Sequence, residues 1–192
     1  MATALLLGAG SGALHAVTGP DHVLSLGPVA LRRTRGSWRV GIAWGLGHAL
    51  GTLVLAVPAL VVAGLVHVPA LAAWGDRLAG VALIGTAAWS WRAMRRCAEG
   101  EPDGRNPVLV GLVHGMTGAG SLVLVLPVLL TGSTGRSLAF LVAFAVGSTL
   151  AMAGLTAALA RVGARLEGRV VARLQRAMVA ASLALGAAWV VV

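Results

Sequence analysis

The stretch LHAVTGPDHVLSLGP, residues 14–28, carries polar and ionisable side chains within an otherwise apolar segment. Within eight residues it holds two histidines, one acid and a Gly-Pro pair: His15, Asp21, His22 and Gly19-Pro20. Proline cannot donate a backbone hydrogen bond and its ring clashes with the preceding turn, while glycine accepts unusual dihedral angles. We therefore expect a helix that unwinds at this pair and continues as a second half-helix beginning with Asp21 and His22.

The composition around this stretch is that of a membrane protein. Of 192 residues, 58% are hydrophobic and only 11% are charged, whereas a soluble domain has about 25% charged residues. Six apolar stretches approach or exceed the ~20 residues that a helix needs to cross the hydrocarbon: 3–31, 40–66, 78–91, 107–131, 137–160 and 177–192. The sequence therefore predicts an all-α membrane protein with six transmembrane helices in a single membrane domain.

The positive charge of the chain is distributed unevenly between the expected linkers. The net charge is +9, and all basic residues apart from histidine are arginine. The first, third and fifth linkers hold thirteen arginines, and the second and fourth hold one each, Arg77 and Arg136. The thirteen are Arg32, Arg33, Arg35, Arg39, Arg92, Arg95, Arg96, Arg105, Arg161, Arg165, Arg169, Arg173 and Arg176. Because arginine is retained on the cytoplasmic side, both termini are expected outside. The arginines flank apolar runs, so the expected partner is a lipid bilayer and not nucleic acid. The usage is rich in alanine, valine and arginine and lacks lysine, which is typical of a high-GC bacterial genome, so the expected location is a bacterial inner membrane.

The two halves of the chain resemble each other. When residues 12–31 are set above residues 111–130, seven of twenty positions are identical: Gly12/Gly111, His15/His114, Thr18/Thr117, Gly19/Gly118, Pro28/Pro127, Val29/Val128 and Leu31/Leu130. Three spans in each half require the second half to be inverted, an architecture that recurs in secondary transporters. We expect repeats over residues 1–98 and 99–192, with the first and fourth helices broken.

The ionisable residues in the apolar stretches form a ligand set for a transition metal. Asp21 is the only acid there, and an ionised Asp at the centre of a span costs roughly 2.5–3.5 kcal/mol. Nitrogen and oxygen donors without cysteine suit nickel, cobalt, zinc or iron(II) better than calcium or magnesium; manganese is a further candidate. The predicted metal ligands are His15, Asp21, His22, His48 and His114; Thr18 and Thr117 line the pathway, and Gly19, Pro20 and Gly118 act as hinges. Glycines beside His48, at 45, 47 and 51, allow a close helix approach that brings its ring to the broken segment.

HAVTGPDH, residues 15–22, resembles the membrane signature of the nickel/cobalt transporter family, in which a His is followed by Asp-His. It is closer still to short six-span relatives described as nickel-transporter-like or urease-accessory membrane proteins, within a wider lysine-exporter-like group. Those proteins share a Gly-His-Ala, matched at 47–49, and a His-Gly-x-x-Gly-x-Gly, matched at 114–120. The resemblance implies that His15, Asp21 and His22 are metal ligands or filter residues, and that the cargo is nickel or cobalt.

The leading prediction is a secondary transporter of a divalent transition metal that works by alternating access. It is not an enzyme and has no permanently bound cofactor. One alternative is an accessory membrane protein that binds or delivers metal without net flux; another is a transporter of the same fold for a non-metal solute. A metal-dependent hydrolase is disfavoured because HExxH is absent and one acid is available. The structural alternative is that Asp21 caps a helix and the histidines bond between helices. A homo-oligomer or a metallocentre-assembly partner stays open.

Overall fold

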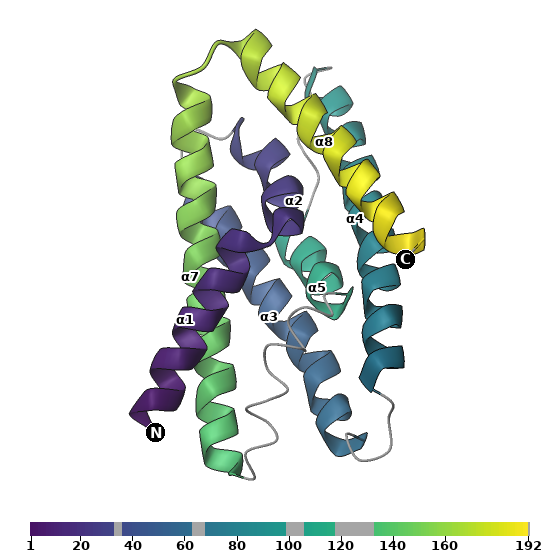
Figure 1. The fold of residues 1–192 in the computed structure, drawn as a ribbon. Helices are drawn as coiled ribbons and strands as arrows, with labels where there is room; N and C mark the ends of the chain where they lie inside the picture. The colour runs from purple at the N-terminus through teal and green to yellow at the C-terminus, as the bar shows by residue number, and fades with distance from the viewer. Residues whose placement is uncertain (33–35, 63–67, 99–105, 118–132, 192) are drawn as a thin grey trace.

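A computed structural model describes residues 1–32, 36–62, 68–98, 106–117 and 133–191, and in these ranges every element is an α-helix (Figure 1). The helices are α1 (Ala2–Thr18), α2 (Pro20–Ala30), α3 (Ser37–Val62), α4 (Val68–Ala98), α5 (Pro107–Thr117), α7 (Thr134–Ala164) and α8 (Gly168–Val191). The all-α prediction is confirmed for this part of the chain.

Two of the described helices are long and apolar enough to cross a membrane. They are Gly135–Ala164 within α7 and Gly168–Val191, which is α8; Ala2–Thr18 and Pro107–Met116 are apolar but shorter. The first expected span is divided into pieces of 17 and 11 residues, so neither piece crosses about 30 Å of hydrocarbon by itself. Six spans were expected, and length and apolarity support two among the described helices.

The helices extend beyond the apolar stretches that predicted them. α4 has 31 residues where residues 78–91 were expected, and α8 begins at Gly168 instead of 177. Most arginines assigned to linkers therefore lie on helix ends, and that assignment was wrong. Arginine is a good helix former, and hydropathy marks only the part of a helix that suits lipid. Arg176 is an example, since its Nε donates a hydrogen bond to the Ala172 carbonyl one turn earlier at 3.2 Å.

The break in the first segment is a single residue, Gly19, between α1 and α2. Its backbone angles, φ −67° and ψ 110°, are open to any residue, so the expected reason for glycine was wrong. The requirement is space: a Cβ at Gly19 would collide with the His22 ring and lie 2.7 Å from Asp21 Oδ1. Pro20 opens α2 at a position where its missing N–H is tolerated. Gly118, the corresponding hinge of the second half, lies outside the described residues.

Close helix crossings form the rest of the bundle. α1 runs along α7, α3 contacts both α5 and α7, and α4 packs on α8. The short α2 contacts α4, α7 and α8 and lies between the longer helices (Figure 1). Four glycines allow backbone contact in two crossings, because a Cβ would strike a carbonyl oxygen of the partner helix: Gly12 on Phe144 and Gly147 on Ala9 in the α1–α7 pair, and Gly111 on Trp44 and Gly47 on Val108 in the α3–α5 pair.

The glycines beside His48 therefore act differently from the expectation. Gly47 and Gly51 were expected to bring α3 to the broken segment; they instead admit α5, since a Cβ at either would collide with a carbonyl oxygen of that helix. Gly45 packs against Thr149 of α7. The broken segment contacts α3 through the rings of His15 and His22, which lie beside Trp44 and His48.

The arginine-bearing ends of the helices gather at one end of the bundle. The end of α2, the end of α4 and the corner between α7 and α8 lie at the top of Figure 1, opposite the start of α7. This end is called the arginine-rich end below; the arginines on these helix ends and the α7–α8 corner are Arg32, Arg92, Arg95, Arg96, Arg161, Arg165 and Arg169.

Candidate metal centre

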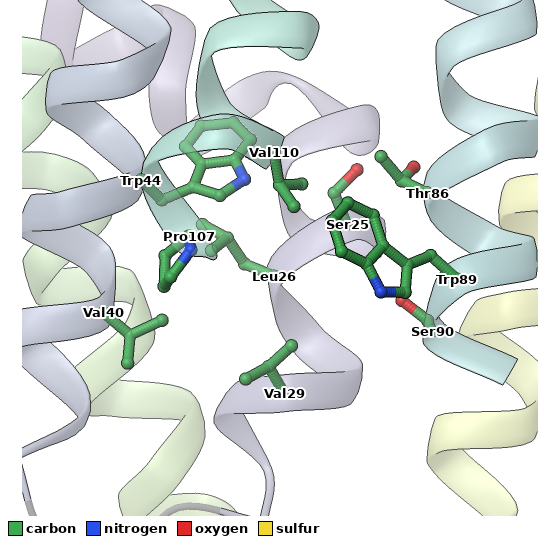
Figure 2. A pocket seen from close by; sticks show the side chains of 10 residues that line it. All are labelled: Ser25, Leu26, Val29, Val40, Trp44, Thr86, Trp89, Ser90, Pro107 and Val110. Atoms are coloured by element: carbon green, nitrogen blue, oxygen red, sulfur yellow. The ribbon is translucent and has the colours of Figure 1, made fainter. Parts of the chain in front are cut away.

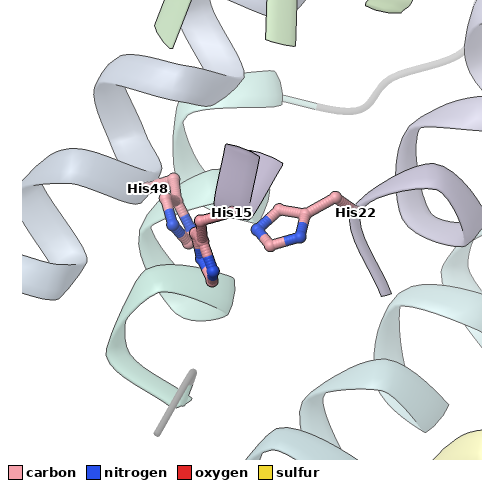
Figure 3. A group of neighbouring side chains, drawn as sticks. All are labelled: His15, His22 and His48. Carbon is pink, nitrogen blue, oxygen red and sulfur yellow. The ribbon is translucent and has the colours of Figure 1, made fainter. Parts of the chain in front are cut away.

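The five predicted ligands lie together in the centre of the bundle, brought there by four helices. His15 is in the last turn of α1, Asp21 and His22 open α2, His48 is on α3 and His114 on α5. The His22 ring centroid is 4.7 Å from that of His15, 5.1 Å from His48 and 5.0 Å from His114. Figure 3 shows His15, His22 and His48 facing one another from three separate elements.

These side chains form two overlapping triads. One consists of His15, His22 and His48, and the other of Asp21, His22 and His114; in each, the potential ligand atoms lie within 4.8 Å of one another. His22 belongs to both. The first triad is neutral when its imidazoles bind metal, whereas the second includes a carboxylate and neutralises half the charge of a dication.

Asp21 is held by two imidazoles. His114 Nε2 donates to Asp21 Oδ2 at 2.8 Å, and His22 Nδ1 lies 3.1 Å from Asp21 Oδ1. The N-cap of α2 is Gly19, and Asp21 lies in the first turn of the helix. Its carboxylate is directed into the histidine cluster.

Several ring nitrogens in the cluster lack a protein partner. His22 and His48 are each 1% exposed, and among the described residues His22 Nε2 and both nitrogens of His48 have no hydrogen-bond partner. Nine in ten buried polar groups are satisfied, and leaving one unsatisfied costs about 1–3 kcal/mol. A metal ion or ordered water would satisfy these nitrogens.

The spacing of the donors suits a small metal ion. Two donors about 2.0–2.1 Å from a tetrahedral ion lie about 3.3 Å apart. Asp21 already stands 2.8 Å from His114 and 3.1 Å from His22. The ligand atoms of all three residues lie within 4.8 Å of one another, and the glycine crossing of α3 and α5 holds His48 beside them.

Trp44 is also part of the cluster, although it was not among the residues predicted from the sequence. Its ring stacks on His48 with centroids 5.3 Å apart and planes 6° from parallel, and its centroid lies 5.6 Å from His22 and 5.1 Å from His114. The side chain is 2% exposed. Its position four residues before His48 on the same helix is the signal that could have identified it.

The predicted pathway threonines do not join the cluster. Thr18 is exposed and donates its hydroxyl hydrogen bond to the Leu14 carbonyl of its own helix at 2.8 Å, so its placement gives no support to a pathway role. The side chain of Thr117 lies outside the described residues. Pro20 lies at the hinge without contributing a polar group to the cluster.

The chain is similar to two plant proteins. It is 30% identical over 164 residues to "Chloroplast protein FOR GROWTH AND FERTILITY 2" of Arabidopsis thaliana, covering 76% of this chain and 44% of that protein. It is 29% identical over 184 residues to "Chloroplast protein FOR GROWTH AND FERTILITY 1" of the same plant, covering 83% and 50%. The chain thus spans about half the length of these curated relatives. No family model and no solved structure matches it.

These relatives correct two expectations. The resemblance to the nickel/cobalt transporter family was wrong, because the proteins that match over most of the chain carry another name and no family model matches. The resemblance depended on short motifs, and five residues separate His15 from Asp21 where that family has four. The expected bacterial inner membrane also receives no support, since both relatives are named as chloroplast proteins.

Proposed function

We propose that this chain is an integral membrane protein that binds a divalent transition-metal cation within its helical bundle and carries the ion across the bilayer as cargo. The observation that carries the proposal is the convergence of four imidazoles and one carboxylate on a buried point between α1, α2, α3 and α5. A carboxylate and imidazoles so deep among apolar side chains are costly unless they bind something.

The donor set defines the class of ion. Imidazole nitrogen with one carboxylate oxygen favours borderline ions such as zinc, cobalt, nickel and iron(II) over hard, oxygen-seeking calcium and magnesium. Because the carboxylate triad leaves a smaller net charge than the triad of three histidines, we place the resting ion at Asp21, His22 and His114.

Three features support movement of the ion. The cluster lies at a one-residue break between half-helices, as in transporters that bind their substrate where a helix is interrupted. The α1–α7 and α3–α5 crossings repeat the same glycine contacts at positions 99 or 100 residues apart, which supports two inverted halves that rock against each other. The overlapping triads give the ion two adjacent positions joined by His22. The arginine-rich end is proposed to face the compartment in which the chain is made.

Isothermal titration of the purified chain with zinc, cobalt, nickel and manganese tests the binding step. We expect binding of at least one ion, weaker binding at lower pH because the imidazoles must be neutral to coordinate, and strong loss of affinity in Asp21→Asn. If no ion binds, or if Asp21→Asn binds every ion as the wild type does, the metal centre is wrong.

Flux in proteoliposomes then separates carriage from storage. With metal outside and a fluorescent chelator inside, the transporter fills the vesicles faster than Asp21→Asn does. Equal filling by both proteins, together with intact metal binding, would identify an accessory protein that holds metal without moving it. Transport of a non-metal solute would predict that no tested ion binds or enters.

A further inference from the structure

A small cavity is lined in part by Trp44. It has a volume of about 30 Å³ and lies between α2, α3, α4 and α5 (Figure 2). The lining residues are Ser25, Leu26, Val29, Val40, Trp44, Thr86, Trp89, Ser90, Pro107 and Val110. One ordered water needs roughly 10–15 Å³, so the cavity holds water if its walls are polar enough.

Its walls supply unsatisfied polar groups. Ser25 is 6% and Trp44 2% exposed, and neither Ser25 Oγ nor Trp44 Nε1 has a hydrogen-bond partner in the described part of the chain. In Figure 2 the indole nitrogen of Trp44 is turned toward the interior between Val110 and Ser25. Each group needs water or a ligand in the cavity to avoid a desolvation cost.

The cavity is directed toward one end of the bundle. Val29 lies near the end of α2, Val40 near the start of α3, and Pro107 is the first residue of α5. These positions place the cavity between Trp44 and the arginine-rich end. The Trp44 ring also contacts His22, His48 and His114, so it borders both the cavity and the histidine cluster.

We propose that this cavity is a hydrated vestibule through which the metal ion reaches and leaves the histidine cluster from the arginine-rich end, with the Trp44 ring as the barrier between the two. The inference rests on the proposed function. Hydroxyls of Ser25, Thr86 and Ser90 replace part of the hydration shell of the ion as it passes, and a swing of the indole opens the way to His48.

Stopped-flow mixing of the chain with cobalt(II), followed by its visible absorption, measures the association and dissociation rates. Ser25→Leu removes a polar wall and fills the cavity, so we expect both rates to fall by about tenfold, which corresponds to a barrier about 1.4 kcal/mol higher, while Kd stays unchanged. Thr86→Val, which keeps the shape of the side chain, should slow both rates by a smaller factor. A change of both rates in proportion identifies a path, whereas a ligand would change Kd.

Ser182→Ala is the matched control. Ser182 is 1% exposed, its hydroxyl donates to the Met178 carbonyl of its own helix at 2.9 Å, and it is not among the residues that line the cavity; its variant should bind cobalt at wild-type rates. Unchanged rates in both Ser25→Leu and Thr86→Val, or a change in Kd with an unchanged association rate, would overturn the vestibule. A wild-type chain that binds no cobalt would overturn the proposed function and the vestibule with it.

Discussion

The α1–α7 and α3–α5 pairs are packed alike but carry different chemistry. In each pair one glycine of the shorter helix lies on a carbonyl of the longer one, Gly12 on Phe144 and Gly111 on Trp44. A second glycine, on the longer helix, lies against a carbonyl of the shorter one: Gly147 against Ala9 and Gly47 against Val108. Small residues permit such backbone approach. The crossing geometry is thus set by residues that have no part in binding.

The difference between the pairs lies in the side chains beside these glycines. α3 presents Trp44 and His48, whereas the corresponding positions of α7, 100 residues later, hold Phe144 and Ser148. Ser148 is buried, its hydroxyl donates to the Ala145 carbonyl of its own helix at 3.1 Å, and it takes the place of an imidazole ligand. Among the described residues, two similar crossings therefore yield one candidate metal centre, placed where α3–α5 meets the break between α1 and α2.

The largest expected effect comes from removing the ligand that the two triads share. His22→Ala should weaken metal binding by roughly 100-fold, since the about 10–16 kcal/mol of a four-ligand structural zinc site corresponds to on the order of 3 kcal/mol for each ligand. Isothermal titration measures the loss. The control is Ser148→Ala, at the position of α7 that corresponds to His48 of α3, and it should bind metal as the wild type does. Equal affinities in the two variants would remove the distinction between the helix pairs.

The second prediction tests whether the two crossings contribute equally to the stability of the fold. Gly47→Ala and Gly147→Ala each force a methyl group onto a backbone oxygen, which costs about 1–3 kcal/mol by overpacking, less about 1 kcal/mol gained in helix propensity. Unfolding in mixed micelles should show similar losses of stability. Gly47→Ala should also weaken metal binding, because it separates His48 from His114. Destabilisation in only one of the two would show that the crossings are not equivalent.

The third prediction concerns the hinge. Gly19→Ala has no backbone penalty, because φ is negative, but its methyl group displaces His22 and Asp21. Metal affinity should fall about tenfold, or 1.4 kcal/mol, with helix content by circular dichroism unchanged. Gly10→Ala on the same helix meets no atom within 4 Å and should leave affinity intact. Normal metal binding by Gly19→Ala would show that the contacts of a methyl group with His22 and Asp21 are not the reason for glycine at this position.

The sequence was informative where polar groups conflict with an apolar environment. Asp21 and four histidines are costly in lipid-like surroundings, and that cost alone selected the residues that converge in the structure. Gly19-Pro20 likewise predicted the break, because few residues so strongly interrupt a helix. These conclusions depend on local chemistry and on no contact between distant residues.

Other features depended on tertiary packing and were missed or mistaken. The approach of Gly47 to α5 and the contacts of Trp44 with His22 and His114 are set by how the helices cross. The space at Gly19 and the stacking of Trp44 on His48 are local contacts, and their signals in the sequence were missed. Helix ends extended past the apolar stretches because arginine continues a helix into the polar region. Motif matching gave a family that the whole-chain comparison contradicts, since a few residues in an apolar background carry little information about ancestry.

The smallest expected effect makes α3 resemble α7 at one position. Trp44→Phe keeps an aromatic face on His48 but removes the indole N–H that lines the vestibule. Metal affinity should change by less than about threefold, under 0.7 kcal/mol, because the ring is not a ligand, while cobalt(II) should enter and leave faster past a smaller barrier. Equilibrium titration and stopped-flow rates measure the two quantities separately. A large loss of affinity with unchanged rates would instead make Trp44 a support for His48, and the two helix pairs would then differ in their core as well as in their ligands.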